Sequence, residues 1–182
     1  MNQELYFLRS SEQYLAKELL YYAARLDEGD TRLEDFPLLE QYERNYGSYN
    51  GDIGVYIMVE GKVAGGAWVR ILANGFGYVD DNTPELVFAV KPEFRNQGIG
   101  TAIMQQLFIE VSKSFSQISL SVRETNPVIS LYERLGFTKV EGTEHKNPAG
   151  TLSFTMIKHL DEFKQAQEVK HLEEECFRKS FS

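Results

Sequence analysis

The sequence contains little of what extracellular, metal-binding or membrane proteins usually require. Its 182 residues include one cysteine, Cys176, so no intrachain disulfide can form, and no Cys/His spacing resembles a zinc site. No apolar run reaches the length of a membrane span, and the first residues lack the basic and apolar stretches of a signal peptide. We therefore expect a soluble, cytoplasmic protein without a metal site.

Positive charge is also scarce. The chain carries 19 Lys and Arg against 27 Asp and Glu, which gives a formal net charge of -8 and a pI near 5.0. Proteins that bind nucleic acids usually present a basic surface, so this balance argues against a nucleic-acid partner. Hydrophobic residues make up 42% and aromatics 13%, which excludes a disordered chain and suits one domain with a sizeable core.

The hydrophobic pattern predicts one α/β domain over residues 1–159 and a charged helical extension over residues 160–182. Strands are expected near residues 4–9, 52–72 (two strands joined at Glu60 and Gly61), 85–91, 117–122, 137–143 and 150–160. Helices are expected from Ser11 to about Leu26, within residues 36–47, from about Gly98, and from Asn126 to Gly136. This order predicts a mixed, mostly antiparallel central sheet flanked by helices on both faces.

A buried strand passes into a helix at two closely spaced glycines, Gly98 and Gly100. The first turn of a helix has unpaired N–H groups and a partial positive charge, and glycine lets an anion approach them closely. Arg95 adds positive charge, so we expect a phosphate-bearing ligand here, with a tight turn that binds nothing as the alternative. Ile103 replaces the third glycine of a dinucleotide fingerprint, and no lysine precedes Thr101 as a Walker loop requires.

Two segments of this region resemble the GNAT superfamily of N-acetyltransferases. VKPEFRNQGIGTAIM resembles its acyl-CoA binding motif, Arg/Gln-x-x-Gly-x-Gly/Ala, at Arg95, Gly98 and Gly100. NPVISLYERLGF resembles its second motif at Asn126, Tyr132, Gly136 and Phe137. The resemblance spans about residues 52–158. It implies the GNAT-like acyl-CoA N-acyltransferase fold and an acetyl-CoA-dependent N-acetyltransferase of the EC 2.3.1 class.

The resemblance also implies which residues hold acetyl-CoA. Backbone groups of Phe88 and Val90 would pair with the pantetheine arm, while the amides from Arg95 to Thr101 would hold the pyrophosphate. Asn126 would hydrogen-bond the cofactor. The residues expected to bind acetyl-CoA are Phe88, Ala89, Val90, Arg95, Asn96, Gln97, Gly98, Ile99, Gly100, Thr101, Asn126 and Tyr132.

Acetyl transfer needs a neutral amine and a proton for the leaving thiolate. By resemblance, Tyr132 would lie near the sulfur, and with a reference pKa near ~10 against ~8.5 for a thiol it suits a proton donor. Glu85 would be the base, although a charge at the end of a strand explains it as well. Asp80 and Asp81 would either attract a cationic substrate or form a turn. No role is expected for the histidines, His145, His159 and His171, which lie outside the matched motifs.

The sequence leaves the acetyl acceptor open. We expect a small-molecule primary amine that attacks acetyl-CoA directly in a ternary complex. The alternatives are a protein N-terminus, as for ribosomal-protein acetyltransferases, or a sensor module that binds acyl-CoA without turnover. A homodimer is compatible with each of these. Aromatic residues that could line an acceptor pocket are Tyr21, Tyr22, Tyr42, Tyr46, Trp68, Phe76 and Tyr78.

Overall fold

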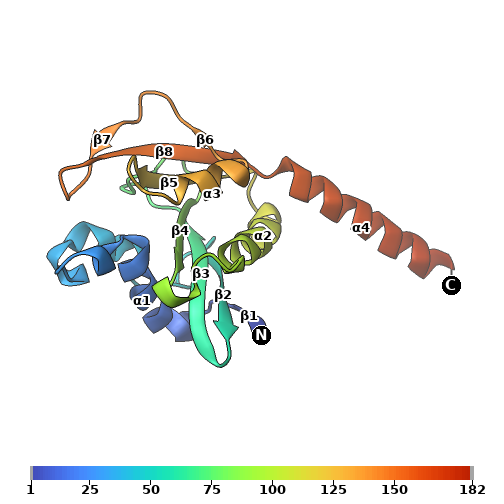
Figure 1. The fold of residues 1–182 in the computed structure, drawn as a ribbon. Coiled ribbons are helices and arrows are strands. Elements are labelled where there is room, and N and C mark those ends of the chain that lie inside the picture. Colours follow the sequence, from blue (N-terminus) through green and yellow to red (C-terminus); the bar gives the residue numbers. More distant parts are fainter. Residues whose placement is uncertain (1, 181–182) are drawn as a thin grey trace.

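One sheet organises the computed structural model, which describes residues 2–180 (Figure 1). Its eight strands are β1 (Gln3–Phe7), β2 (Ile53–Val59), β3 (Lys62–Arg70), β4 (Glu85–Val90), β5 (Gln117–Arg123), β6 (Thr138–Lys139), β7 (His145–Lys146) and β8 (Leu152–His159). The spatial order is β1-β2-β3-β4-β5-β8-β6, and β7 also pairs with β8. The β4–β5 pair is parallel and the other pairs are antiparallel, which confirms the predicted mixed sheet.

The β2–β3 hairpin forms where its turn chemistry predicts. Glu60 and Gly61 both have positive φ angles, 48° and 77°, as a two-residue type I′ turn requires. Such a turn follows the right-handed twist of its strands, and so it fixes the pairing of Val59 with Lys62. The rest of β3 then pairs with β4 on its other side.

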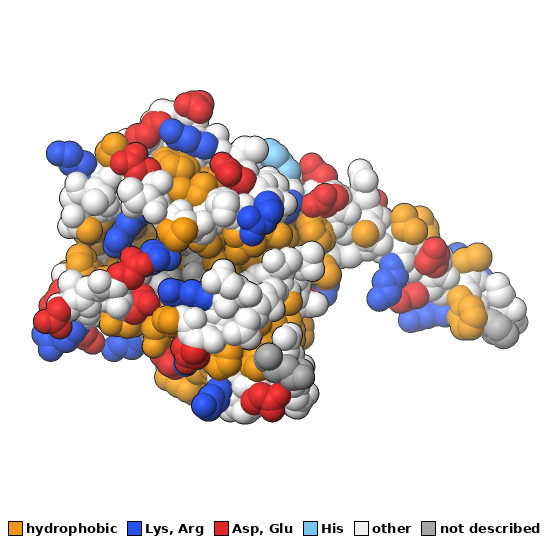
Figure 2. Space-filling view, in the orientation of Figure 1, with side chains coloured by type: hydrophobic (Ala, Val, Ile, Leu, Met, Phe, Trp, Pro, Cys, Tyr) orange, Lys and Arg blue, Asp and Glu red, His pale blue; other side chains and the backbone are white. Residues whose placement is uncertain are grey.

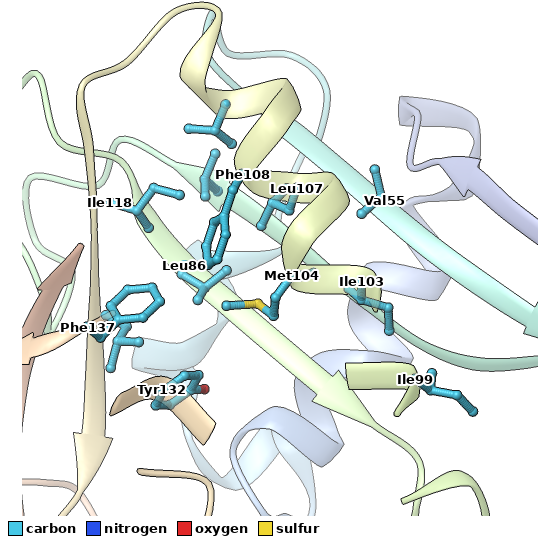
Figure 3. Close-up of a cluster of buried hydrophobic side chains, with 14 of the residues drawn as sticks. Val55, Leu86, Ile99, Ile103, Met104, Leu107, Phe108, Ile118, Tyr132 and Phe137 are labelled. Carbon is cyan, nitrogen blue, oxygen red and sulfur yellow. The ribbon is translucent and has the colours of Figure 1, made fainter. Parts of the chain in front are cut away.

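Helices cover the sheet on opposite faces and enclose two cores. The α2 helix (Ile99–Ser112) packs on β2 and β3, and its buried positions repeat four residues apart, as the sequence predicts: Ile99, Ile103, Leu107 and Val111. Figure 3 shows Ile103, Met104 and Leu107 pointing from this helix toward the strands. The α1 helix (Gln13–Ala23) packs on β3 and β4 from the other face, with Leu15, Leu19 and Leu20 buried.

The parallel strands β4 and β5 separate soon after they begin to pair. Glu85 of β4 is in register with Ser119 of β5, and the Ser119 N–H donates to the Pro84 carbonyl at 3.1 Å. Toward the carboxyl end of β4 no further pairing with β5 is present among the described residues, while β5 remains paired with β8 along its other edge. The edge of β4 that faces β5 is therefore open from Leu86 onward.

The helix expected within residues 36–47 is wrong. The structure contains one 3-10 segment there, η4 (Pro37–Tyr42), and another, η3 (Leu33–Asp35), precedes it. Side chains from β3 bind the carbonyls that an α-helix would need: Trp68 Nε1 donates to the Tyr42 carbonyl at 2.8 Å, and Arg70 Nη1 donates to the Arg44 carbonyl at 2.7 Å. These bonds tie the segment to the sheet in a non-helical path. The first helix also ends earlier than expected, at Ala23 instead of about Leu26.

The α4 helix (Asp161–Ser180) extends away from the sheet, and Figure 1 shows its C-terminal part clear of the body. Its first turns are attached to α2 by Gln167 Nε2, which donates to the Ile109 carbonyl at 2.8 Å, and by Phe163, whose ring is 5.6 Å from that of Phe108. Farther along, Val169 and Leu172 are exposed, and Figure 2 shows hydrophobic side chains along the projecting helix. No helix within residues 2–180 is long and apolar enough to cross a membrane.

Candidate active site

The predicted anion-binding turn lies at the start of α2. Gly98 is the N-cap of this helix and has φ +78°, a conformation that favours glycine, and a Cβ added there would meet no atom within 4 Å. At Gly100 a Cβ would lie 2.9 Å from Cζ of Phe88. The absence of both side chains leaves the first amides of a 14-residue helix accessible, and these amides favour a negatively charged group.

The open edge of β4 carries backbone groups directed away from its neighbour. Lys91 donates its N–H to the Ala64 carbonyl at 2.8 Å and so faces β3. Because an antiparallel strand alternates between residues that face the partner and residues that face away, the N–H groups of Val90 and Phe88 point away from β3. The Val90 carbonyl accords with this, because it accepts a bond from Arg95 Nε at 2.9 Å.

A cavity of about 500 Å³ joins the open strand edge to the helix N-terminus. Its walls come from the end of α1, from β4, from the turn before α2 and from the second sequence motif. The predicted cofactor residues that line it are Phe88, Ala89, Val90, Arg95, Asn96, Gly98, Gly100, Thr101, Asn126 and Tyr132. Gln97 and Ile99 do not line it: Gln97 donates to the Glu93 carbonyl, and Ile99 is buried in the core.

Sequence reasoning missed the contribution of α1 to this cavity. Tyr22, Ala23 and Arg25 also line it. Arg25 has a left-handed backbone with φ 58°, and its Nη1 donates to Asn126 Oδ1 at 3.3 Å. Asn126 Oδ1 also accepts the Val128 N–H at 3.0 Å, which fixes this side chain before α3 (Ile129–Arg134). The sequence gives no signal that Arg25 and Asn126 are adjacent.

Tyr132 stands where this cavity meets a second one. It lines both, as do Ala23, Arg25, Phe88 and Asn126. Its ring packs edge-on against Phe88 at 6.2 Å and at a tilt against Phe137 at 5.5 Å, and Figure 3 shows its hydroxyl oxygen directed away from Phe137. Burial raises the pKa of Tyr132 above that of an ordinary tyrosine, so its hydroxyl keeps its proton at neutral pH.

The second cavity, of about 150 Å³, contains the predicted base. Glu85 is 2% exposed, and its Oε1 accepts bonds from the Tyr42 hydroxyl at 2.7 Å and from the Gly77 N–H at 2.8 Å. Its Oε2 is buried and has no partner among the described residues. Burial raises the pKa of Glu85 to about 7, although the two hydrogen bonds oppose the change. The carboxyl can therefore bind and release a proton near neutral pH.

The loop before β4 passes close to the carboxyl group of Glu85. A Cβ added to Gly75 would lie 2.0 Å from Oε2 of Glu85, so only glycine fits there without moving the carboxyl group. The other acidic residues of this loop serve the turn: Asp80 Oδ1 accepts bonds from the Asn82 N–H and the Thr83 hydroxyl. Of the two roles expected for Asp80, turn formation is the one that the contacts support.

Aromatic rings form one wall of the second cavity. Tyr42 and Phe76 stack at 6.2 Å with an interplanar angle of 17°, and Phe76 stacks on His145 at 6.1 Å and 10°. All three residues line the cavity. Tyr42 and Phe76 were among the aromatics expected there, whereas Trp68 is buried in the core and Tyr78 lies at the surface. His145 was assigned no role from the sequence, and the structure places it in the wall of this cavity.

Among residues 2–180, no group of three or more His, Cys, Asp or Glu side chains is arranged to hold a metal ion. The site thus consists of an anion-binding helix terminus, an open strand edge, a buried tyrosine and a buried carboxyl group. These parts suit an elongated ligand with a phosphate at one end and a reactive group near Tyr132.

Comparisons with known proteins show what part of the chain is similar to. Residues 51–139 match the sequence model described as Acetyltransferase (GNAT) domain. A search of curated proteins finds no match to the chain.

Several solved structures share the fold. The ribosomal-protein-S18-alanine N-acetyltransferase of Escherichia coli is 19% identical, with a TM-score of 0.63 over 87% of this chain and 94% of that one. An N-acetyltransferase of Thermoplasma acidophilum in complex with coenzyme A is 17% identical, with a TM-score of 0.60 over 87% and 99%. A chimera of a Vibrio cholerae spermidine N-acetyltransferase is 17% identical, with a TM-score of 0.61 over 90% and 98%.

The match to this domain supports an acyltransferase of the EC 2.3.1 class. More specifically, residues 51–139 are similar to the acetyltransferase domain of the GNAT family, in agreement with the resemblance of the sequence motifs. The domain match includes β2 to β6 and therefore Glu85, the glycine turn and Tyr132.

Proposed function

We propose that the protein transfers an acetyl group from acetyl-CoA to a primary amine of a small molecule, with both substrates bound at once. The observation that carries this proposal is the position of Tyr132, at the junction of the large cavity with the smaller one that holds Glu85. One cavity suits an elongated phosphate-bearing donor, and the other suits a compact acceptor.

The residues of the large cavity fit acetyl-CoA, which supplies an activated acetyl thioester when bound. The amides at the start of α2 and the positive charge of Arg95 would hold its pyrophosphate. The unpaired N–H groups of Phe88 and Val90 would bind the extended arm as a neighbouring strand does. One of these N–H groups on the open edge of β4 would also stabilise the negative charge that develops on the thioester carbonyl oxygen during the attack.

Two side chains would move the protons. Glu85 would accept a proton from the amine, and it lies about 10 Å along β4 from Phe88 at roughly 3.3 Å per residue, so a chain of water molecules would complete the path. Tyr132 would donate its proton to the leaving sulfur. Although burial raises the pKa of Tyr132, the same apolar surroundings increase the proton affinity of a thiolate.

The size of the second cavity supports a small acceptor. It holds about 150 Å³, and its walls include residues of α1, of η4 and of the loop between β7 and β8. A protein N-terminus would need an open groove that admits several residues of extended chain. The names of similar structures include acetyltransferases for a ribosomal protein and for spermidine, so the comparisons leave this choice open.

Calorimetry and a thiol-release assay test the proposal. Acetyl-CoA should bind the wild type, and a panel of primary amines should release free thiol with at least one member. Tyr132→Phe should keep acetyl-CoA binding and lose turnover by about 10²-fold or more. Tyr14→Phe is the matched control, because Tyr14 is 67% exposed. Absence of acetyl-CoA binding would refute the proposal, and binding without turnover on any amine would indicate a sensor module.

A further inference from the structure

The side-chain amide of Asn126 has a fixed orientation. Its Oδ1 accepts the Val128 N–H at 3.0 Å and lies 3.3 Å from Nη1 of Arg25. A backbone N–H and a guanidinium group can only donate hydrogen bonds, so the atom that both of them contact is the amide oxygen. The amide nitrogen, Nδ2, is therefore directed away from these two donors.

The amide nitrogen of Asn126 is accessible. No residue within 2–180 bonds to Nδ2, and Nδ2 is not among the buried side-chain atoms that lack a partner, so a solvent or ligand atom can reach it. Asn126 lines both cavities, together with Phe88 and Tyr132. An amide nitrogen carries two hydrogens and accepts none, so a ligand that bonds to it must offer an acceptor such as a carbonyl oxygen.

Arg25 is itself held in place on both sides. Its guanidinium group pairs with Glu28, and its side chain is only 19% exposed. The backbone just before it is also bound, because the Ala24 carbonyl accepts a bond from Arg123 Nη2 at 3.1 Å. Arg25 has a φ of 58°, which is unfavourable for a residue of this kind, and such a conformation persists where the surroundings maintain it, often at functional sites.

We propose that Arg25 is a positioning residue for the acyl donor: it holds the oxygen of Asn126, so that Nδ2 donates to a carbonyl oxygen of the pantetheine arm. This inference rests on the proposed binding of acetyl-CoA. Arg25 acts through Asn126 and makes no bond to the donor itself. It lies after α1, outside the residues 51–139 that match the family model.

The position of Asn126 suits the arm of the donor better than its pyrophosphate. The pyrophosphate is expected at the start of α2, and Gly98 and Gly100 line only the large cavity. Asn126 lines both cavities, as Tyr132 does, and so it lies toward the reactive end of the ligand. The arm that joins these two ends contains amide carbonyls, which are the acceptors that Nδ2 requires.

A double-mutant cycle tests whether Arg25 acts through Asn126. Calorimetry gives the dissociation constant of coenzyme A for the wild type, Arg25→Met, Asn126→Ala and the double variant. Arg25→Met alone should weaken binding about tenfold, which corresponds to one hydrogen bond. Where Asn126 is already alanine, the same change should have an effect of less than about twofold. Equal factors in both backgrounds would show that Arg25 acts directly or through its charge, and would overturn the proposal.

Two conservative variants test the chemistry of each group. Arg25→Lys keeps a long side chain with N–H donors, so it should recover most of the affinity that Arg25→Met loses. Asn126→Asp keeps an oxygen for Arg25 and Val128 but replaces the donor Nδ2 by a second acceptor. Coenzyme A should bind this variant at least as weakly as Asn126→Ala. Binding of wild-type strength to Asn126→Asp, or no recovery in Arg25→Lys, would contradict the proposed roles.

Stability measurements distinguish positioning from support of the fold. Glycine suits the left-handed backbone at this position, so Arg25→Gly should unfold in urea at the wild-type midpoint or above it, although coenzyme A binds about tenfold more weakly. Arg32→Met is the matched control, because its side chain is 80% exposed, and it should change neither quantity. In Arg25→Met, KM for acetyl-CoA should rise while kcat stays within about twofold. Affinity that falls only together with stability would show that Arg25 is structural.

The same measurements separate this inference from the proposed function. Calorimetry with coenzyme A needs no turnover, so it tests Arg25 even where no amine releases thiol. If the wild type and Arg25→Met bind coenzyme A equally well, the inference is wrong and the proposed function stands. If the wild type does not bind coenzyme A, both are wrong. Binding of coenzyme A without thiol release from any amine counts against acetyl transfer alone.

Discussion

Replacement of Glu85 by glutamine should change how the stability of the protein depends on pH. The folded-state pKa of Glu85 is about 7 against an ordinary value of 4.5, because the carboxyl is buried. A raised pKa means that the folded state binds the proton more tightly than the unfolded state. The contribution of Glu85 to stability is thus complete below pH 4.5 and is lost as the pH rises through 7.

The size of this effect follows from the two pKa values. One pKa unit corresponds to about 1.4 kcal/mol, so the change from 4.5 to about 7 amounts to about 3 kcal/mol. Glutamine cannot ionise, and its amide oxygen can keep the bonds from Tyr42 and Gly77. Relative to the wild type, Glu85→Gln should therefore gain up to about 3 kcal/mol of unfolding free energy between pH 5 and pH 8.

Urea unfolding of both proteins at several pH values measures this difference. Subtracting the wild-type curve from the variant curve cancels the contributions of other titrating groups, provided that they behave alike in both proteins. The same variant should lose most of its acetyl-transfer activity, because the proposed base is gone. A free-energy difference that is constant from pH 5 to pH 8 would show that the Glu85 carboxyl does not titrate in this range, and would refute the reasoning.

Three further substitutions test the geometry of the site and its support. Gly75→Ala should lower turnover without weakening acetyl-CoA binding, because its Cβ would lie 2.0 Å from Glu85 Oε2; unchanged kinetics would contradict this. Gly98→Ala should lower the unfolding free energy by about 1–2 kcal/mol, because φ is +78° at this position, even though the added Cβ would meet no other atom. Chemical denaturation measures the change, and an unaltered midpoint would argue against it. Arg70→Met should lower the unfolding free energy by about 3–5 kcal/mol, because it leaves Asp52 buried without its ion-pair partner and both side chains are 1% exposed. Thermal unfolding followed by circular dichroism measures the loss. A variant as stable as the wild type would be inconsistent with it.

Local sequence patterns were enough to predict the parts of the site that are contiguous in the chain. Two glycines at a strand-to-helix junction predicted the open turn before α2, and a spacing of four between apolar residues predicted the buried face of that helix. Alternation and turn residues predicted the β2–β3 hairpin. These features depend on interactions between residues near one another in sequence, so a short stretch of sequence is enough to predict them.

The remaining features depend on contacts between distant segments. Residues 36–47 have a helical pattern, but Trp68 and Arg70 bind their carbonyls from β3, which lies more than twenty residues away. His145 lines the smaller cavity and stacks on Phe76, and no spacing rule connects these two residues. The adjacency of Arg25 and Asn126 is of the same kind. Such contacts follow from the packing of the whole sheet.

The projecting α4 helix affects how the size of this protein is measured. Its 20 residues extend about 30 Å at 1.5 Å per residue, and its first turns are attached to the body. A monomer of 20.9 kDa with such an arm diffuses more slowly than a sphere of equal mass and leaves a gel-filtration column early. Elution volume alone would therefore exaggerate the mass, whereas sedimentation equilibrium, which is insensitive to shape, would give the true number of subunits.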